Sequence, residues 1–252
     1  MKIPPTPALL LAAAALLPAC ASDAGGDREH ALEWYQRGTG YSGDGRADKA
    51  LPFYQRAVEL DPELAPAHHL LALSLAAVGR GEEALAAYDR AIELQPGKSR
   101  VYVDRGWTLS GMGRHGEALV DYGRALEVDP GQSEAWFNRG RTLAAMDRHA
   151  EAIPAYERAI ELRDGFHGAI RERGVALHAL GRHEESLAAY DKALRVGPHD
   201  GSRTLLCRGR LLAELGRLDE AEADLAAALE ARRGYPEAEA ELEALRRTRA
   251  GG

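Results

Sequence analysis

The sequence predicts an all-α fold in which about six helical hairpins stack into a solenoid. Tyrosines recur every 34 residues, small residues keep the same step, and the composition combines only 6% aromatic residues with 27 glycines. Such a composition suits helices whose backbones approach closely and does not suit a β-sandwich or barrel. Because self-similarity at a fixed period is typical of repeat architectures, the hairpins are expected to pack side by side.

Three columns of residues set the register of the repeat. The tyrosine column is Tyr54, Tyr88, Tyr122, Tyr156 and Tyr190. The small-residue column is Gly38, Ala72, Gly106, Gly140 and Gly174, and the mid-unit turn column is Gly45, Gly79, Gly113, Asp147 and Gly181. Small residues predict close contact between two antiparallel helices, and the turn residues predict a tight connection between them. The tyrosines are expected to fill the gaps between neighbouring hairpins.

Prolines mark the ends of the predicted units. A proline near the end of four units stops the second helix: Pro62, Pro96, Pro130 and Pro198. Two further prolines, Pro52 and Pro154, fall early in a predicted second helix. Because a missing amide is tolerated in the first turn, both of these helices are predicted to start within one turn of the proline.

In this register the pattern resembles the tetratricopeptide repeat (TPR) family. The first unit matches its signature positions with Trp34, Gly38, Tyr41, Gly45, Ala50, Tyr54, Ala57 and Pro62. The resemblance covers residues 31–235 and implies a right-handed superhelical α-solenoid of helix-turn-helix units. These units are 31–64, 65–98, 99–132, 133–166, 167–200 and 202–235, and the sixth has Leu225 where the others have tyrosine. Residues 236–249 begin with proline, carry acidic residues early and arginines late, and are predicted to form a capping helix.

The amino terminus predicts export. Residues 8–17 are an uninterrupted apolar run behind a single lysine. As a helix this run reaches about 15 Å, half of the roughly 30 Å that a spanning helix must cross. Residues 1–19 are therefore predicted to be a signal peptide rather than a membrane anchor.

The end of this segment, residues 17–20, resembles the lipobox of bacterial lipoproteins, although Pro18 stands where the family has a small or β-branched residue. The resemblance implies a lipid on Cys20, a linker over residues 20–30 and a membrane-anchored protein facing the periplasm. Ala21 favours the outer membrane over the inner one by analogy with enterobacterial lipoproteins. The alternative is an ordinary cleaved secretory peptide, which gives a soluble periplasmic or secreted protein.

Charge and motifs argue against several functions. The formal net charge is −7, whereas a nucleic-acid binder needs a basic face. Gly38, Gly40 and Gly43 match a dinucleotide fingerprint, which requires a preceding strand and a following helix, but helical repeat sequence lies on both sides of them. Three histidines (His115, His149 and His183) recur one per unit, which spaces them too widely to share a metal ion. No catalytic motif stands out from the repeated background, so no catalysis, cofactor, metal or small-molecule substrate is expected.

The family resemblance places partner binding in a concave groove lined by the first helix of every hairpin. Carrying over its groove positions gives Tyr35, His69, Leu73, Val103, Asp104, Trp107, Phe137, Asn138, Arg141, Arg171, Glu172, Arg203 and Arg210, together with His178 and Cys207. This strip begins apolar and aromatic and ends with four arginines. It predicts capture of an extended or helical protein segment with apolar and acidic groups, in which Trp107 and Phe137 anchor the apolar part and Arg141, Arg171 and Arg210 the acidic part.

Alternatives remain at this stage. In the alternative interpretation of the groove, Trp107 and Phe137 are packed against neighbouring helices. The arginines are then paired with local carboxylates on a solvated face. The leading functional hypothesis is a non-catalytic adaptor that docks proteins at a membrane, because bacterial lipoproteins of similar layout assist pilus secretin assembly or recruit peptidoglycan hydrolases. The other hypotheses are a self-associating structural unit and an accessory to an enzyme with a hidden site.

Overall fold

A computed structural model describes residues 24–43, 45–197 and 201–251, and these form thirteen α-helices and no strand. The six first helices of the hairpins are α1 (Ala24–Gly43), α3 (Ala65–Ala77), α5 (Ser99–Gly111), α7 (Ser133–Ala145), α9 (His167–Ala179) and α11 (Ser202–Glu214). The six second helices are α2 (Ala47–Leu60), α4 (Gly81–Leu94), α6 (His115–Val128), α8 (His149–Leu162), α10 (His183–Val196) and α12 (Leu218–Ala231). Helix α13 (Pro236–Gly251) follows them. The predicted all-α architecture is confirmed.

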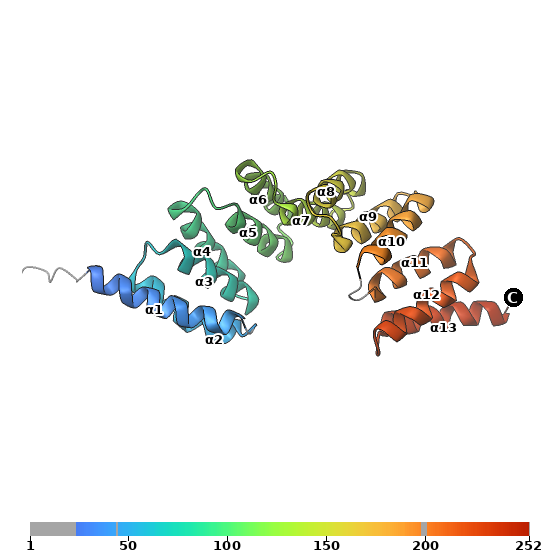
Figure 1. Cartoon of the computed structure of the whole chain (residues 1–252), viewed down its shortest axis with the longest axis horizontal. Helices are drawn as coiled ribbons and strands as arrows, with labels where there is room; N and C mark the ends of the chain where they lie inside the picture. The colour runs from blue at the N-terminus through green and yellow to red at the C-terminus, as the bar shows by residue number, and fades with distance from the viewer. Residues whose placement is uncertain (1–23, 44, 198–200, 252) are drawn as a thin grey trace, which may run out of the picture.

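The hairpins stack in chain order into an arch. Figure 1 shows α1 and α13 at opposite ends of the arch, with α6 to α8 at its middle. Each first helix from α3 onwards contacts the next first helix, whereas no comparable contact joins successive second helices in the described residues. The first helices therefore stand closer together, and the stack curves towards them. We call the face that they present the inner wall, and the face on the side of the second helices the outer face.

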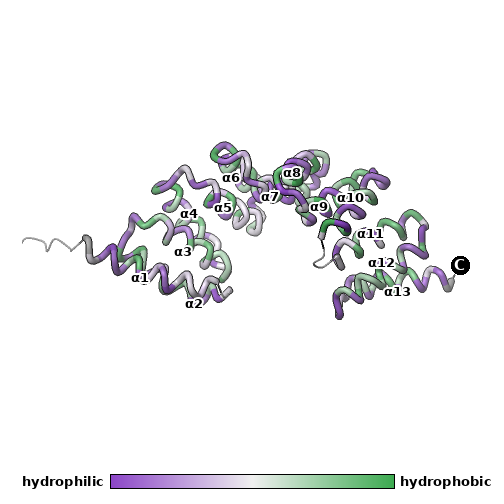
Figure 2. The backbone as a smooth tube through the Cα atoms, viewed as in Figure 1, coloured by the Kyte–Doolittle hydropathy of each residue, from purple (hydrophilic) through white to green (hydrophobic). Residues whose placement is uncertain are grey.

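Hydrophobic and hydrophilic residues alternate around the helices, as Figure 2 shows. One face of each helix packs on its neighbours and the other meets water. The largest fully buried side chains are the five column tyrosines, each at most 1% exposed. Each of the first five hairpins therefore has one fully buried tyrosine ring in its core.

Each tyrosine ring lies within its own hairpin, against the small-residue column. A Cβ atom added to Gly140 would lie 2.6 Å from a ring carbon of Tyr156, and one on Gly174 would lie 2.7 Å from the ring of Tyr190. The rings were expected between neighbouring hairpins, but they also fill the space between the two helices of one hairpin. At these two positions glycine therefore gives clearance for the ring as well as close backbone contact, whereas Ala72 of the same column shows that the second hairpin accommodates a Cβ atom.

The predicted turns adopt the backbone conformation that favours glycine. Gly79 and Gly113 have φ angles of +82° and +78°. Asp147, which occupies the same column, has a φ of +57° and is the one non-glycine residue with positive φ in the described residues. The turn geometry is therefore kept even where the side chain is unfavourable for it.

The prediction for the two early prolines is wrong. Pro52 and Pro154 are each the sixth residue of their helices, which begin at Ala47 and His149, so each helix starts more than one turn before its proline. Both prolines are exposed on the outer face. A carbonyl that loses its amide partner there can be hydrated, which explains why the helix continues through the proline.

The carboxyl-terminal helix covers the last hairpin. Leu242 and Leu245 of α13 are buried in a cluster with Leu212 and Leu225. At the helix end, Arg249 donates hydrogen bonds to Glu222 and Asp219 of α12. The apolar side of the sixth hairpin is thereby covered by α13, whose other side is charged.

Among the described helices, none combines the length and the apolar character needed to cross a bilayer. Residues 1–23, which include the predicted signal peptide and Cys20, lie outside the described residues.

Candidate functional site

The inner wall holds most of the side chains that the sequence selected for the groove, but two of these are buried. Val103 is 2% exposed and Asp104 is 8% exposed. Val103 belongs to the hydrophobic core beneath α5, and Asp104 is surrounded by protein partners. The expectation that these two residues line the groove surface is therefore wrong.

Asp104 joins two first helices. Its carboxylate pairs with His69 Nε2 of α3 at 2.9 Å and accepts hydrogen bonds from Arg100 Nε of its own helix at 3.0 and 3.1 Å. The side chain of His69 is only 19% exposed. This network fixes α3 against α5. The Asp104 carboxylate is therefore occupied by protein partners and not available to a ligand.

The centre of the inner wall carries a stack of aromatic and cationic side chains. Trp107 of α5 is 50% exposed. Among the described residues it is the one aromatic side chain in the exposed class. The Arg141 guanidinium of α7 lies 4.7 Å from the Trp107 ring centre and 5.8 Å from that of Phe137. Phe137 in turn packs 4.8 Å from Phe166, at the start of α9. The stack thus spans three successive hairpins.

Arg141 has no carboxylate partner in the part of the chain that the structure describes, and its side chain is exposed. Its only described contacts are with aromatic faces, which leave the N–H groups at the edge of the guanidinium available. Trp107 and Arg141 therefore remain open to a partner. Phe137 is half-buried and packs against the Arg141 guanidinium.

Two of the other predicted arginines differ from Arg141 because each has a carboxylate partner. Arg171 pairs with Glu172 at 3.0 Å, and both side chains are mostly buried. Arg210 pairs with Glu241 of α13 at 2.7 Å. Both were expected to hold partner carboxylates, but a neighbouring carboxylate already occupies each of them. Arg203 is exposed and, among the described residues, has no ion pair.

The remaining predicted residues have supporting positions. Tyr35 packs 6.1 Å from the Tyr54 ring, and Leu73 lies against the main hydrophobic cluster. Asn138 is half-buried on α7. Burial, with a further contribution from Glu172, raises the pKa of the Cys207 thiol above its ordinary value. That thiol is therefore protonated, and so uncharged, near neutral pH.

Sequence reasoning missed the polar side chains beside the stack. Ser110 Oγ lies 3.0 Å from Thr142 Oγ1 and 3.3 Å from His115 Nδ1. With Trp107 and Arg141 they line a cavity of about 270 Å³ between α5, α7 and the start of α6. The repeat column gave only a weak signal, because Ser110 stands between Ala76 and Ala144 of the neighbouring units but the first unit also has a serine, Ser42.

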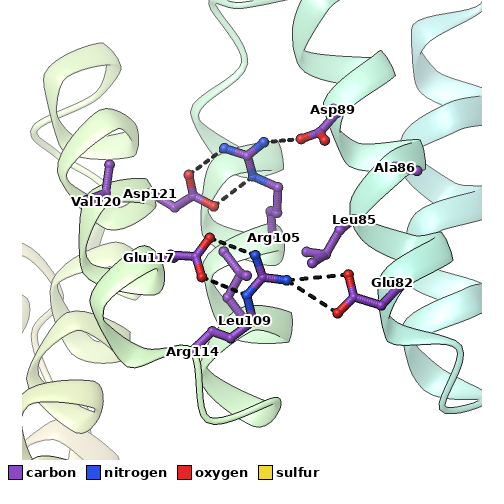
Figure 3. A pocket seen from close by; sticks show the side chains of 10 residues that line it. All are labelled: Glu82, Leu85, Ala86, Asp89, Arg105, Leu109, Arg114, Glu117, Val120 and Asp121. Carbon is purple, nitrogen blue, oxygen red and sulfur yellow. Dashed lines mark hydrogen bonds and ion pairs between the residues drawn. The ribbon is translucent and has the colours of Figure 1, made fainter.

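The outer face also has a cavity, of about 500 Å³, but its charges are paired. Figure 3 shows Arg105 bridging Asp121 and Asp89, and Arg114 bridging Glu117 and Glu82. Arg105 donates to Asp121 at 2.8 and 2.6 Å, and its Asp121 partner is buried. These ion pairs fasten α4, α5 and α6 to one another, and the cavity offers no unpaired arginine.

Two motifs noted in the sequence have structural positions. The glycines of the formal dinucleotide fingerprint lie within α1, where Gly38 faces the Tyr54 ring, so no phosphate-binding turn is formed there. The recurring His115, His149 and His183 are each the first residue of a second helix. In the described part of the chain, no three histidine, cysteine, aspartate or glutamate side chains form a group suited to a metal ion.

Comparison with known families and structures follows the same register. Family models described as tetratricopeptide repeat match residues 31–64, 63–131, 103–167, 148–201 and 171–236. No curated protein matched the chain.

Three solved structures share the fold. PilF of Pseudomonas aeruginosa superposes with a TM-score of 0.72 at 24% identity, over 87% of this chain and 99% of that one. PilW, a widely conserved type IV pilus biogenesis factor, gives a TM-score of 0.76 at 20% identity, over 84% and 98%. YrrB, a TPR protein with an unusual peptide-binding site, gives 0.59 at 23% identity, over 75% and 97%. At these identities the likeness shows a common architecture.

Proposed function

Since this chain belongs to the tetratricopeptide repeat family, we propose that it is a non-catalytic adaptor whose inner wall binds an extended or helical protein segment. Stacked repeats of this kind build extended concave surfaces that are used for binding. The observation that carries the proposal is the exposed Trp107 with the unpaired Arg141 over its ring, because buried aromatic and arginine side chains dominate the energy of protein interfaces.

The chemistry of the stack indicates the kind of segment. Trp107 offers an apolar face, and Arg141 offers N–H donors that suit a carboxylate. A segment with neighbouring apolar and acidic groups satisfies both. The paired Arg171 and Arg210 could contribute only by exchanging their internal carboxylates, so the acidic contact centres on Arg141.

The setting of this function is the bacterial envelope. We propose residues 1–19 as a signal peptide, Cys20 as the lipid attachment site, residues 20–30 as the tether, residues 31–235 as the binding solenoid and residues 236–249 as its cap. The architectural likeness to PilF and PilW supports a role in assembling an envelope complex such as a type IV pilus.

Affinity capture from envelope extracts tests the binding role. We expect Arg141→Glu to lose the partner that the wild-type protein captures, because reversed charge repels an acidic segment. The matched control is Arg139→Glu on the same helix, since Arg139 likewise lies over an aromatic ring, that of Trp136. Equal capture by wild type and both variants would refute the inner wall as the binding surface.

Substitution of the lipid site tests the setting. Cys20→Ser removes the sulfur that the lipid requires, so the protein is expected to leave the membrane fraction. Continued retention of Cys20→Ser in membranes, after a high-salt wash that removes peripheral proteins, would overturn the lipoprotein assignment.

A further inference from the structure

The cavity beside Trp107 differs chemically from four larger cavities of the described structure. Its lining includes Arg141, His115 and two hydroxyl groups, and it contains no carboxylate. The four larger cavities each contain aspartate or glutamate side chains beside their arginines. This is therefore a hollow where a cation faces open space without an internal counter-ion.

Arg141, Ser110 and Thr142 supply hydrogen-bond donors to this cavity. The Arg141 guanidinium carbon lies 4.7 Å from the Trp107 ring centre and 5.8 Å from that of Phe137. Ser110 and Thr142 form a hydroxyl pair at 3.0 Å in the cavity lining. Thr142 is only 2% exposed, so this part of the lining is shielded from water. A guanidinium fork beside a hydroxyl pair in a partly desolvated hollow suits the two oxygens of a single carboxylate.

The repeat offers an internal comparison. At the next junction, the positions of Trp107, Ser110 and Arg141 are taken by Arg141, Ala144 and Val175, which removes the hydroxyl group and the second member of the stack. The polar cavity is thus a departure from the repeated background. In a duplicated fold, such a departure cannot be explained by inheritance of the shared packing pattern.

We propose that this cavity is a binding subsite for one carboxylate group of the segment on the inner wall, with the apolar neighbour of that carboxylate on the Trp107 face. The inference rests on the proposed function and sharpens it. The carboxylate comes either from an aspartate or glutamate side chain or from the carboxyl terminus of a chain. The cavity volume of about 270 Å³ accommodates one carboxylate group and part of a neighbouring side chain.

Small blocked dipeptides test the subsite on the full-length protein. The probes are N-acetyl-Leu-Glu-amide against N-acetyl-Leu-Gln-amide, and N-acetyl-Leu-Leu with a free carboxyl terminus against its amide. Binding is followed by NMR through the indole N–H signals of the three tryptophans. The Trp107 signal is assigned by its loss in Trp107→Phe.

We expect at least one of the two acids to shift the Trp107 signal at millimolar concentration, with its amide shifting it far less. Arg141→Gln should weaken the binding of that acid about tenfold or more, because a charge-assisted bidentate contact is lost. Arg139→Gln, on the other side of α7, should bind as the wild type does. The acid that binds more tightly identifies whether the carboxylate comes from a side chain or from a chain terminus.

Two results would overturn the subsite: acids that shift Trp107 no more than their amides, or acids that bind Arg141→Gln as well as the wild type. These results are separable from failure of the adaptor role. If partner capture depends on the inner wall but the dipeptide acids do not shift the Trp107 signal, the subsite is refuted and the adaptor role stands. Dipeptide binding without any captured partner would support the subsite and count against the adaptor.

Discussion

Single residues show where the repeat pattern and the local chemistry disagree. Asp147 stands in a turn column that is otherwise glycine, and it holds a left-handed conformation with φ of +57°. Residues with a Cβ atom are strained in this region, although aspartate is better tolerated than most. The side chain is 98% exposed and makes only a distant contact with His149, at 3.8 Å. The strain at this turn is therefore almost uncompensated.

Replacing this residue should stabilise the protein. We expect Asp147→Gly to raise the free energy of unfolding by roughly 0.5–1 kcal/mol, measured by urea denaturation. Gly113→Asp is the matched reverse change, because both positions are followed by arginine and histidine. It should lower the free energy of unfolding by a similar amount. A loss of stability in Asp147→Gly would show that the aspartate side chain has a role that the turn geometry does not explain.

The buried tyrosines make stability depend on alkaline pH. Burial raises the pKa of Tyr122 to about 12, and it raises the pKa of Tyr88, Tyr156 and Tyr190 as well. Above about pH 10 the unfolded chain releases tyrosine protons that the folded protein retains. The unfolded state then binds fewer protons, so the free energy of unfolding falls as pH rises.

This dependence can be assigned to one ring. Tyr122 alone should account for a loss of roughly 2–3 kcal/mol between pH 10 and pH 12, and none below pH 9. Tyr122→Phe should therefore show a shallower fall in the free energy of unfolding across that window, followed by urea denaturation at each pH. An unchanged slope in Tyr122→Phe would mean that the Tyr122 hydroxyl reaches solvent in the folded protein.

At the scale of helices, periodicity predicted the hairpins well because each column has one physical task. The step of the tyrosine and glycine columns fixes which helix faces meet, and helices α2 to α12 follow it. The pattern could not locate the helix starts at Pro52 and Pro154, because an exposed carbonyl can be satisfied by water. Nor could it separate Arg141 from Arg171 and Arg210. A column position gives the face of a helix, but the carboxylate that reaches it, Glu172 or Glu241, depends on side-chain packing.

The capping helix α13 should stabilise its end of the arch only. Leu242 is 7% exposed and packs against the last hairpin. We expect Leu242→Ala to cost about 2–3 kcal/mol and to speed amide hydrogen exchange in α11 and α12. Exchange in α1 to α4 should stay unchanged, because each hairpin contacts only its neighbours.

The control for this change is the adjacent, solvent-facing Glu243. Glu243→Ala should leave exchange as in the wild type. If Leu242→Ala instead accelerated exchange equally in every helix, the solenoid would unfold as one unit and the local account of the cap would be wrong.

At the scale of the molecule, the arch gives two surfaces with different chemistry. On the outer face, ion pairs such as those of Arg105 join successive hairpins, so the charged side chains there neutralise one another. On the inner wall, the Trp107 and Arg141 stack leaves an aromatic face and a cation open. The sequence predicted which helices form this wall but not that its open chemistry concentrates at one junction. That concentration arises from contacts between α5 and α7, which a repeat register does not reveal.

Site-specific photocrosslinking compares the two surfaces most directly. A photoreactive phenylalanine is placed at position 107 on the inner wall or at position 120 on the outer face, where Trp107 is 50% exposed and Val120 is 63% exposed. In cells that make the protein, we expect a discrete protein adduct from position 107 and none from position 120. An adduct from position 120 alone, or the same adduct from both positions, would contradict binding along the inner wall.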